Sequence, residues 1–233
     1  SWLVRLTACA ANANLFVIYL GQFWPQATDP VPRLVLLTLL LGLLAVINYR
    51  GVSGGARLSN IFAVSKLLPL ACFIGIGLFF LGKRAPAASV PASTSAWLEA
   101  VLIVVYAYGG FEAPLMPMAE AKNPRRDAPF ALLTALAIAT ILYTLIQVVV
   151  IGVLSTPMHT ERPLAAAAEQ FLGSPGAVLI SVGALVSLYG YLSSAVLNSP
   201  RLTYALAERG DFPSFLAAVH PRFRTPHLSI VLF

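Results

Sequence analysis

The stretch YAYGGFEAP, residues 106–114, interrupts a long hydrophobic segment near the middle of the chain. The segment 97–119 is long enough to cross a bilayer, which takes roughly 20 apolar residues. Two adjacent glycines and two prolines nevertheless weaken a continuous helix within it. Because lipid does not hydrogen-bond freed backbone groups, non-helical backbone at membrane depth persists only where it is buried in protein or faces a cavity. The interruption therefore predicts a binding site.

Glu112 lies inside this interruption. An ionisable group within a membrane is costly, and by default it indicates a functional site. The alternative is a structural carboxylate that accepts hydrogen bonds from the amides exposed by the break. The residues alone leave both interpretations of Glu112 open.

The composition of the chain indicates a polytopic membrane protein. Hydrophobic residues make up 58% of the 233 residues and charged residues only 10%, against about 25% charged in an average soluble domain. The net charge of +6 does not indicate nucleic-acid binding, because the basic residues form short clusters between apolar runs rather than a stripe with interleaved aromatics. Lipid headgroups are the partners expected for these cations.

The apolar spans predict a single all-α transmembrane domain over residues 1–233. Connections rich in glycine, proline and polar residues separate the spans, and none is long enough for a soluble domain. Residues 163–172 are expected to form a short interfacial helix. Residue 1 is not methionine and residue 233 lies in an apolar run, so we expect part of a longer protein. The spans lie at about 5–22, 33–49, 58–82, 97–119, 130–154 and 175–200, and a seventh begins at 228–233.

The distribution of lysine and arginine predicts the orientation in the cell membrane, since cytoplasmic loops carry an excess of them. Ten cations fall on one side of the predicted spans and four on the other. The side with ten is expected to be cytoplasmic, and it includes the loops 50–57, 120–129 and 201–227. The interrupted span 97–119 then enters the membrane from outside.

Lys66 lies within the third span, away from both clusters of cations. Its flexible stem allows the amine to reach the membrane interface, which is one interpretation. We favour burial, because low-polarity surroundings let a lysine exchange its proton at physiological pH, as proton coupling requires. In the sixth span, Ser187, Tyr191 and Ser194 recur at i, i+4 and i+7 and share one helical face. Such hydroxyls serve helix packing or ligand binding.

Sequence motifs for catalysis or cofactor binding are missing. The sequence has no nucleophile elbow, phosphate-binding glycine loop or HExxH zinc motif. The three histidines, His159, His220 and His227, lie in predicted loops and share no metal-ligand spacing. We therefore expect a protein that is not an enzyme, with no catalytic residue, no metal site and no cofactor.

Two long motifs carry a resemblance to a known family. Residues 106–129, YAYGGFEAPLMPMAEAKNPRRDAP, resemble the sixth transmembrane helix and following loop of the amino acid/polyamine/organocation (APC) permease superfamily. Residues 199–226, SPRLTYALAERGDFPSFLAAVHPRFRTP, resemble the cytoplasmic loop after the eighth helix of the same superfamily. The motif NYRG at residues 48–51 and the lysine-bearing third span fit its fourth-to-fifth helix region. The resemblance covers nearly the whole chain, from the third helix to the start of the ninth.

This resemblance implies a LeuT-like fold of two inverted five-helix repeats, truncated here so that the first two and the last helices lie outside the chain. The first and sixth helices of that fold are broken near the membrane midplane, and half-helix ends bind charged groups of the substrate there. The ammonium group of an amino acid would meet carbonyls at the break, and its carboxylate would be held mainly by the first helix. Phe111 matches the aromatic gate over the substrate, with a packing aromatic as the alternative. The implied substrate-binding residues are Ala107, Tyr108, Gly109, Gly110, Phe111 and Glu112.

The resemblance also assigns a proton-coupling role. Proton-coupled members of the superfamily carry a lysine on the fifth helix, and Lys66 matches that position. Hydroxyls of the eighth helix lie near it, and Ser193 and Ser194 match them. Lys66 is thus the expected proton carrier, although members that work as exchangers or uniporters make less use of this lysine.

The resulting prediction is a secondary active transporter, or permease, of amino acids or related organic cations. It would work by alternating access, driven by protons or by exchange, with a small-molecule substrate. The alternative is a non-transporting membrane sensor or scaffold that retains the permease fold. The sequence leaves the identity of the substrate, the choice between symport and exchange, and the oligomeric state open.

Overall fold

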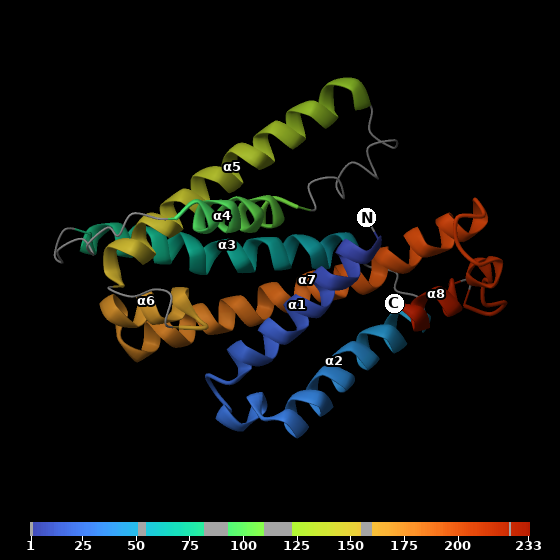
Figure 1. Ribbon diagram of the computed structural model, residues 1–233, viewed down its shortest axis with the longest axis horizontal. Helices are drawn as coiled ribbons and strands as arrows, with labels where there is room; N and C mark the ends of the chain where they lie inside the picture. The colour runs from blue at the N-terminus through green and yellow to red at the C-terminus, as the bar shows by residue number, and fades with distance from the viewer. Residues whose placement is uncertain (1, 51–54, 82–92, 110–122, 155–159, 224) are drawn as a thin grey trace. The chain divides into compact units, whose positions relative to one another are not determined.

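The computed structural model describes residues 2–50, 55–81, 93–109, 123–154, 160–223 and 225–233, with backbone only for 55–66 and 124 (Figure 1). These residues form helices and turns, and no strand occurs among them. The α-helices are α1 (Trp2–Leu20), α2 (Pro30–Arg50), α3 (Gly55–Phe80), α4 (Thr94–Ala107), α5 (Pro124–Val153), α6 (Pro163–Leu172), α7 (Ser174–Glu208) and α8 (His227–Leu232). Two short 3₁₀ helices, η1 (Pro25–Thr28) and η4 (Ser214–Ala217), complete the set.

Four of the helices, α1, α2, α5 and α7, are long and apolar enough to cross a membrane by length and composition. Shorter apolar helices cover Leu67–Phe80 and Thr94–Ala107. The described residues thus confirm the predicted class of an all-α membrane protein. The short helix predicted at 163–172 is present as α6.

The helices extend farther into the predicted loops than the sequence suggests. Arg50, residues 55–57 and residues 124–129 belong to the ends of α2, α3 and α5. The prediction of a loop beginning at Arg201 is wrong, because α7 continues through Pro200 to Glu208. A proline costs a helix one backbone hydrogen bond, which favours an end at that point.

Contacts with α1 offset this cost. The side chain of Pro200 is fully buried. The hydroxyl of Thr203 donates to the Ser199 carbonyl at 3.1 Å, and the Trp2 indole N–H of α1 donates to the Thr203 hydroxyl at 2.8 Å. The helix therefore continues beyond its proline because its next turn is held by a neighbouring helix.

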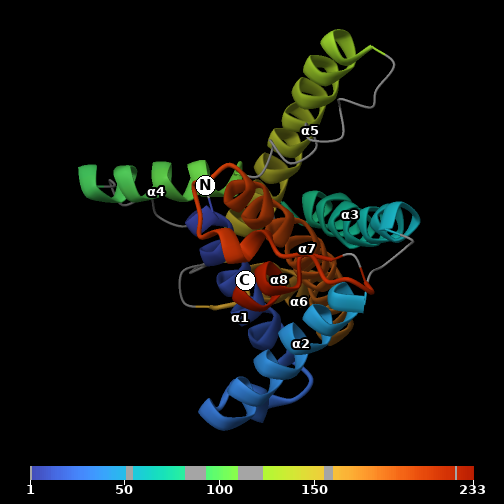
Figure 2. The same ribbon diagram turned by 90° about the vertical axis from the view of Figure 1, so that its right-hand side faces the viewer.

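The described chain divides into two compact units, residues 1–76 with 158–233 and residues 77–157. In the first unit α7 is the central helix, and it contacts α1, α2, α6 and α8 as well as η4. The contact of α7 with α1 is visible in both views (Figures 1 and 2).

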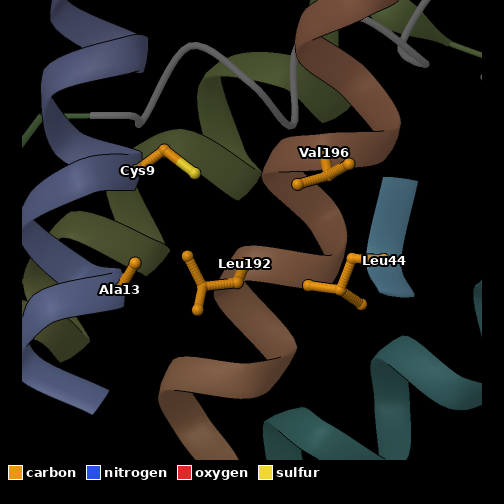
Figure 3. Close-up of a cluster of buried hydrophobic side chains, with 5 residues drawn as sticks. All are labelled: Cys9, Ala13, Leu44, Leu192 and Val196. Carbon is orange, nitrogen blue, oxygen red and sulfur yellow. The ribbon is translucent and has the colours of Figure 1, made fainter. Parts of the chain in front are cut away.

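The core of the first unit lies where α1, α2 and α7 meet (Figure 3). Leu192 of α7 is fully buried between Ala13 of α1 and Leu44 of α2, and Cys9 and Val196 complete the cluster. The small side chains of Cys9 and Ala13 on α1 let α1 and α7 approach closely. Such packing replaces the hydrophobic driving force that is weak between helices in lipid.

A one-residue corner at Gly173 joins α6 to α7. Gly173 has φ of 68°, which only glycine adopts without strain, and its amide donates to the Glu169 carbonyl at 2.9 Å. Because the corner is so short, α6 lies tightly on the start of α7. A Cβ placed on Gly176 would come within 2.7 Å of the Ala168 carbonyl oxygen.

The second unit contains the last turn of α3, α4 and α5. Gly77 of α3 lies against Val149 of α5, and Gly152 of α5 lies against the Leu81 side chain. Val149 is fully buried at this contact. The two glycines thus allow the end of α3 to pack closely on the end of α5.

Candidate functional site

The described part of the predicted interruption is the end of α4. This helix begins after Ser93, whose hydroxyl accepts from the Ala96 amide at 3.3 Å, and it ends at Ala107. The Tyr108 amide donates to the Val104 carbonyl at 3.1 Å, and the Gly109 amide closes back on the Tyr106 carbonyl at 3.0 Å. This last bond spans three residues, which is the tightened turn typical of a helix terminus. The regular helix thus stops inside the segment 97–119.

Two side chains of α5 contact this helix end. The Tyr108 hydroxyl donates to the Thr140 hydroxyl at 3.0 Å, and Thr140 donates to the Leu136 carbonyl at 2.8 Å. The Tyr143 hydroxyl donates to the Ala107 carbonyl at 3.4 Å. The rings of Tyr108 and Tyr143 meet edge to face, with centroids 5.5 Å apart. Helix α5 therefore contacts two of the predicted substrate-binding residues directly.

The remaining predicted substrate residues are not all described. Gly109 lies at the helix end with its backbone exposed. Gly110, Phe111 and Glu112 lie outside the described residues. The aromatic gate and the role of the carboxylate thus stay predictions.

Lys66 belongs to α3, and only its backbone is described. Pro69 follows three residues later inside the same helix and packs against Gly183 of α7, where a Cβ would lie 2.8 Å from the Pro69 ring. The two helices run in opposite directions (Figure 1). This contact determines which residues of α3, the helix that carries Lys66, lie beside which residues of α7, the helix that carries the predicted hydroxyls.

That register brings Lys66 to the level of Ser187. Lys66 lies about 4.5 Å along α3 from the contact, at about 1.5 Å per residue, and Ser187 lies about 6 Å along α7 in the same direction. Ser193 and Ser194 lie about 15 and 16.5 Å along α7, which is about 10.5 and 12 Å beyond Lys66. The pairing of Lys66 with these two serines stays a prediction.

The two serines differ in their surroundings. Ser194 is exposed and its hydroxyl accepts from the Asn198 side-chain amide at 3.1 Å, whereas Ser193 is half-buried. Ser187 is half-buried and shares with Gly183 the face of α7 that meets α3.

Within the described residues, no group of three histidine, cysteine or carboxylate side chains lies close enough to hold a metal ion. His220 and His227 lie 5.5 Å apart between ring centroids, beside Tyr49 and Phe223. The Nδ1 atom of His220 accepts from the Arg222 and Phe223 amides at 3.2 and 3.3 Å. These rings therefore act as packing and capping groups of the segment that precedes α8.

Comparison with known proteins identifies the family of this chain. The family model described as "Amino acid permease" matches residues 1–233, which is the whole chain. The chain belongs to the amino acid permease family. The resemblance to the APC superfamily is thereby confirmed. The family and the apolar helices described above together indicate a multi-pass membrane protein.

Three curated relatives of this permease come from Bacillus subtilis. The serine/threonine exchanger SteT is 35% identical over 193 residues, which cover 80% of this chain and 44% of the relative. The methylthioribose transporter is 29% identical and the branched-chain amino acid permease BcaP is 24% identical, each over 79% of this chain and 40% of the relative. The chain thus spans less than half the length of these relatives. All three names describe transport rather than catalysis, in agreement with the prediction that the protein is not an enzyme.

The sequence patterns do not single out Thr140 and Tyr143. Both lie in the apolar span 130–154 and recur at i and i+3, so that they share one face of α5. Polar hydroxyls in a membrane helix usually find a partner on a neighbouring helix. This spacing is the signal in the sequence, although it does not name the partner.

Proposed function

We propose that the protein containing this chain is a secondary active transporter of amino acids or related organic cations, with the LeuT-like fold of two inverted five-helix repeats. The observation that carries the proposal is the end of α4 at Ala107, inside an apolar segment long enough to cross a membrane. A helix terminus leaves carbonyl groups without amide partners, and lipid offers them none. A substrate cation is a suitable partner.

The ammonium group of the substrate would bind at this helix end. The C-terminus of a helix carries a partial negative charge of about half an elementary charge, which attracts cations. The Ala107 carbonyl and the exposed backbone at Gly109 lie there. The substrate carboxylate would be bound by a helix outside this chain, with Gly110, Phe111 and Glu112 completing the site.

The names of the relatives support an amino acid as the substrate. Two of the three are named for amino acids, serine and threonine in one case and branched-chain amino acids in the other. The name of the first also supports exchange as a transport mode. The methylthioribose transporter indicates that similar chains carry other solutes, so a test needs a broad panel.

Proton coupling through Lys66 forms the second part of the proposal. Protonated and neutral lysine would stabilise different conformations, and a proton would thereby shift the balance between outward-open and inward-open states. Ser193 and Ser194 are the proposed partners, and the register of α3 and α7 adds Ser187 as a third hydroxyl at the level of the lysine.

Ligand-induced thermal stabilisation of the purified full-length protein tests this function. The panel contains the amino acids, polyamines and methylthioribose, each over a range of concentrations. A ligand that binds only the folded state stabilises it by about 2.7 kcal/mol at a hundredfold excess over Kd. We expect a saturable rise in the unfolding temperature with at least one amino acid. No response to any member of the panel would favour the sensor or scaffold over the transporter.

A further inference from the structure

We infer that Thr140 and Tyr143 of α5 are positioning residues that orient the end of α4 for binding the substrate ammonium group. This inference rests on the proposed function, because it concerns the same helix end. It adds two residues from a neighbouring helix that lie outside the quoted motifs.

The direction of the hydrogen bonds at Thr140 is determined by its single proton. The Leu136 carbonyl can only accept, so Thr140 must donate to it, and the bond to Tyr108 must use the Tyr108 proton. The Tyr108 side chain is therefore tied to α5 by a chain of two bonds, at 3.0 and 2.8 Å. Its phenolic oxygen keeps its acceptor positions for another donor.

Tyr143 acts on the neighbouring residue. Its hydroxyl donates to the Ala107 carbonyl at 3.4 Å, and its ring meets the Tyr108 ring at an interplanar angle of 74°. A carbonyl oxygen has two lone pairs, so this bond leaves one for a substrate N–H. The bond also restricts the direction in which the Ala107 carbonyl points.

The location of these hydrogen bonds indicates that they orient the end of α4 and do not merely hold α4 and α5 together. Among the described residues, the side-chain hydrogen bonds from α5 to α4 reach only the last helical residue and its C-cap, Ala107 and Tyr108. The body of α4 receives none there. Thr140 and Tyr143 are both exposed residues, with Tyr143 at 45% exposure, so burial of the hydroxyls is not what these contacts achieve. Their common effect is to fix the end of the helix.

Counterflow measurements on the full-length protein in liposomes test the inference, with L-serine and L-leucine as probes. Tyr143→Phe removes the hydroxyl and keeps the ring, and Thr140→Val removes the acceptor for Tyr108 and keeps the shape. Each lost bond corresponds to a rise in KM of about threefold to tenfold. We expect kcat to change less than KM, and Thr140→Ser to restore the wild-type KM.

The matched control is Tyr106→Phe, which removes a hydroxyl from the same helix. Tyr106 is 52% exposed, and its hydroxyl makes no hydrogen bond to the described residues. We expect this variant to keep the wild-type KM.

A double-mutant cycle separates positioning from general stability. Tyr108→Phe and Thr140→Val remove the same bond, so their effects on KM should combine to little more than the larger of the two. Tyr106→Phe and Thr140→Val share no bond, and their effects should multiply. If these hydrogen bonds only stabilised the fold, removing them would lower the unfolding temperature and leave KM unchanged.

The outcomes distinguish this inference from the proposed function. If the wild type transports a probe but Tyr143→Phe and Thr140→Val behave like Tyr106→Phe, the positioning role is wrong and the transporter stands. If the wild type neither binds nor transports either probe, the proposed function fails for these substrates and the positioning role falls with it.

Discussion

The contact between α6 and the start of α7 gives the sharpest prediction about stability, through the substitution Gly176→Ala. The added methyl group would lie 2.5 Å from Leu172 Cβ and 2.7 Å from the Ala168 carbonyl oxygen. Ordinary contacts begin at 3.4 Å, so these distances are about 0.7 to 0.9 Å too short. Ala168 offers backbone rather than a flexible side-chain end, and α6 as a whole would have to move.

Overpacking of this kind costs typically about 1–3 kcal/mol. The helix propensity gained on replacing glycine by alanine, up to about 1 kcal/mol, offsets part of that cost. A net loss of about 1–2 kcal/mol corresponds to a fall of roughly 2–8 °C in unfolding temperature for 150–250 residues, and to a smaller fall in the longer full-length protein.

The assay is thermal unfolding of the purified full-length protein in detergent, followed by the loss of the monodisperse fraction. Gly42→Ala in α2 is the matched control, because no atom of the described residues outside the neighbouring turns of α2 lies within 4 Å of the added methyl group. We expect this control to match or exceed the wild type. An unfolding temperature for Gly176→Ala equal to that of Gly42→Ala would refute the close approach of α6 to α7.

Two further predictions concern α7 and α3. Thr203→Val removes the acceptor of the Trp2 indole N–H at 2.8 Å, and the unpaired donor should lower the free energy of unfolding by about 1–3 kcal/mol. Thr203→Ser keeps the acceptor and should keep the wild-type unfolding temperature. An equal fall in unfolding temperature in both variants would count against the hydrogen bond. Lys66→Ala should abolish proton-driven uptake in liposomes while amino acid counterflow continues, because counterflow needs substrate binding but no proton carrier. An unchanged dependence of uptake on the pH gradient would remove Lys66 from the coupling mechanism.

The sequence predicts those features that depend on local composition. The apolar runs locate the long apolar helices α1, α2, α5 and α7. The alanine-rich segment between Pro163 and Gly173 becomes α6 at its predicted residues. The glycines at 109 and 110 mark the place where α4 ends, because glycine lowers helix propensity within any surroundings.

Features that depend on contacts between distant residues are missed. Pro200 looks like a helix end, yet α7 continues because Trp2, about two hundred positions earlier in the chain, binds Thr203 in the next turn. Thr140 and Tyr143 look like ordinary residues of an apolar span, and only the packing of α5 beside α4 reveals their partners. A pattern along one helix shows which face is polar but does not show which residue meets it.

Counterflow of an amino acid through the reconstituted full-length protein tests whether this protein is an amino acid transporter. Liposomes are loaded with unlabelled amino acids, and the entry of labelled serine, leucine, lysine and glutamate is followed. We expect saturable entry of at least one of these amino acids, dependent on both the protein and the internal load. Monodisperse, correctly inserted protein that carries none of them, with or without a pH gradient, would contradict it.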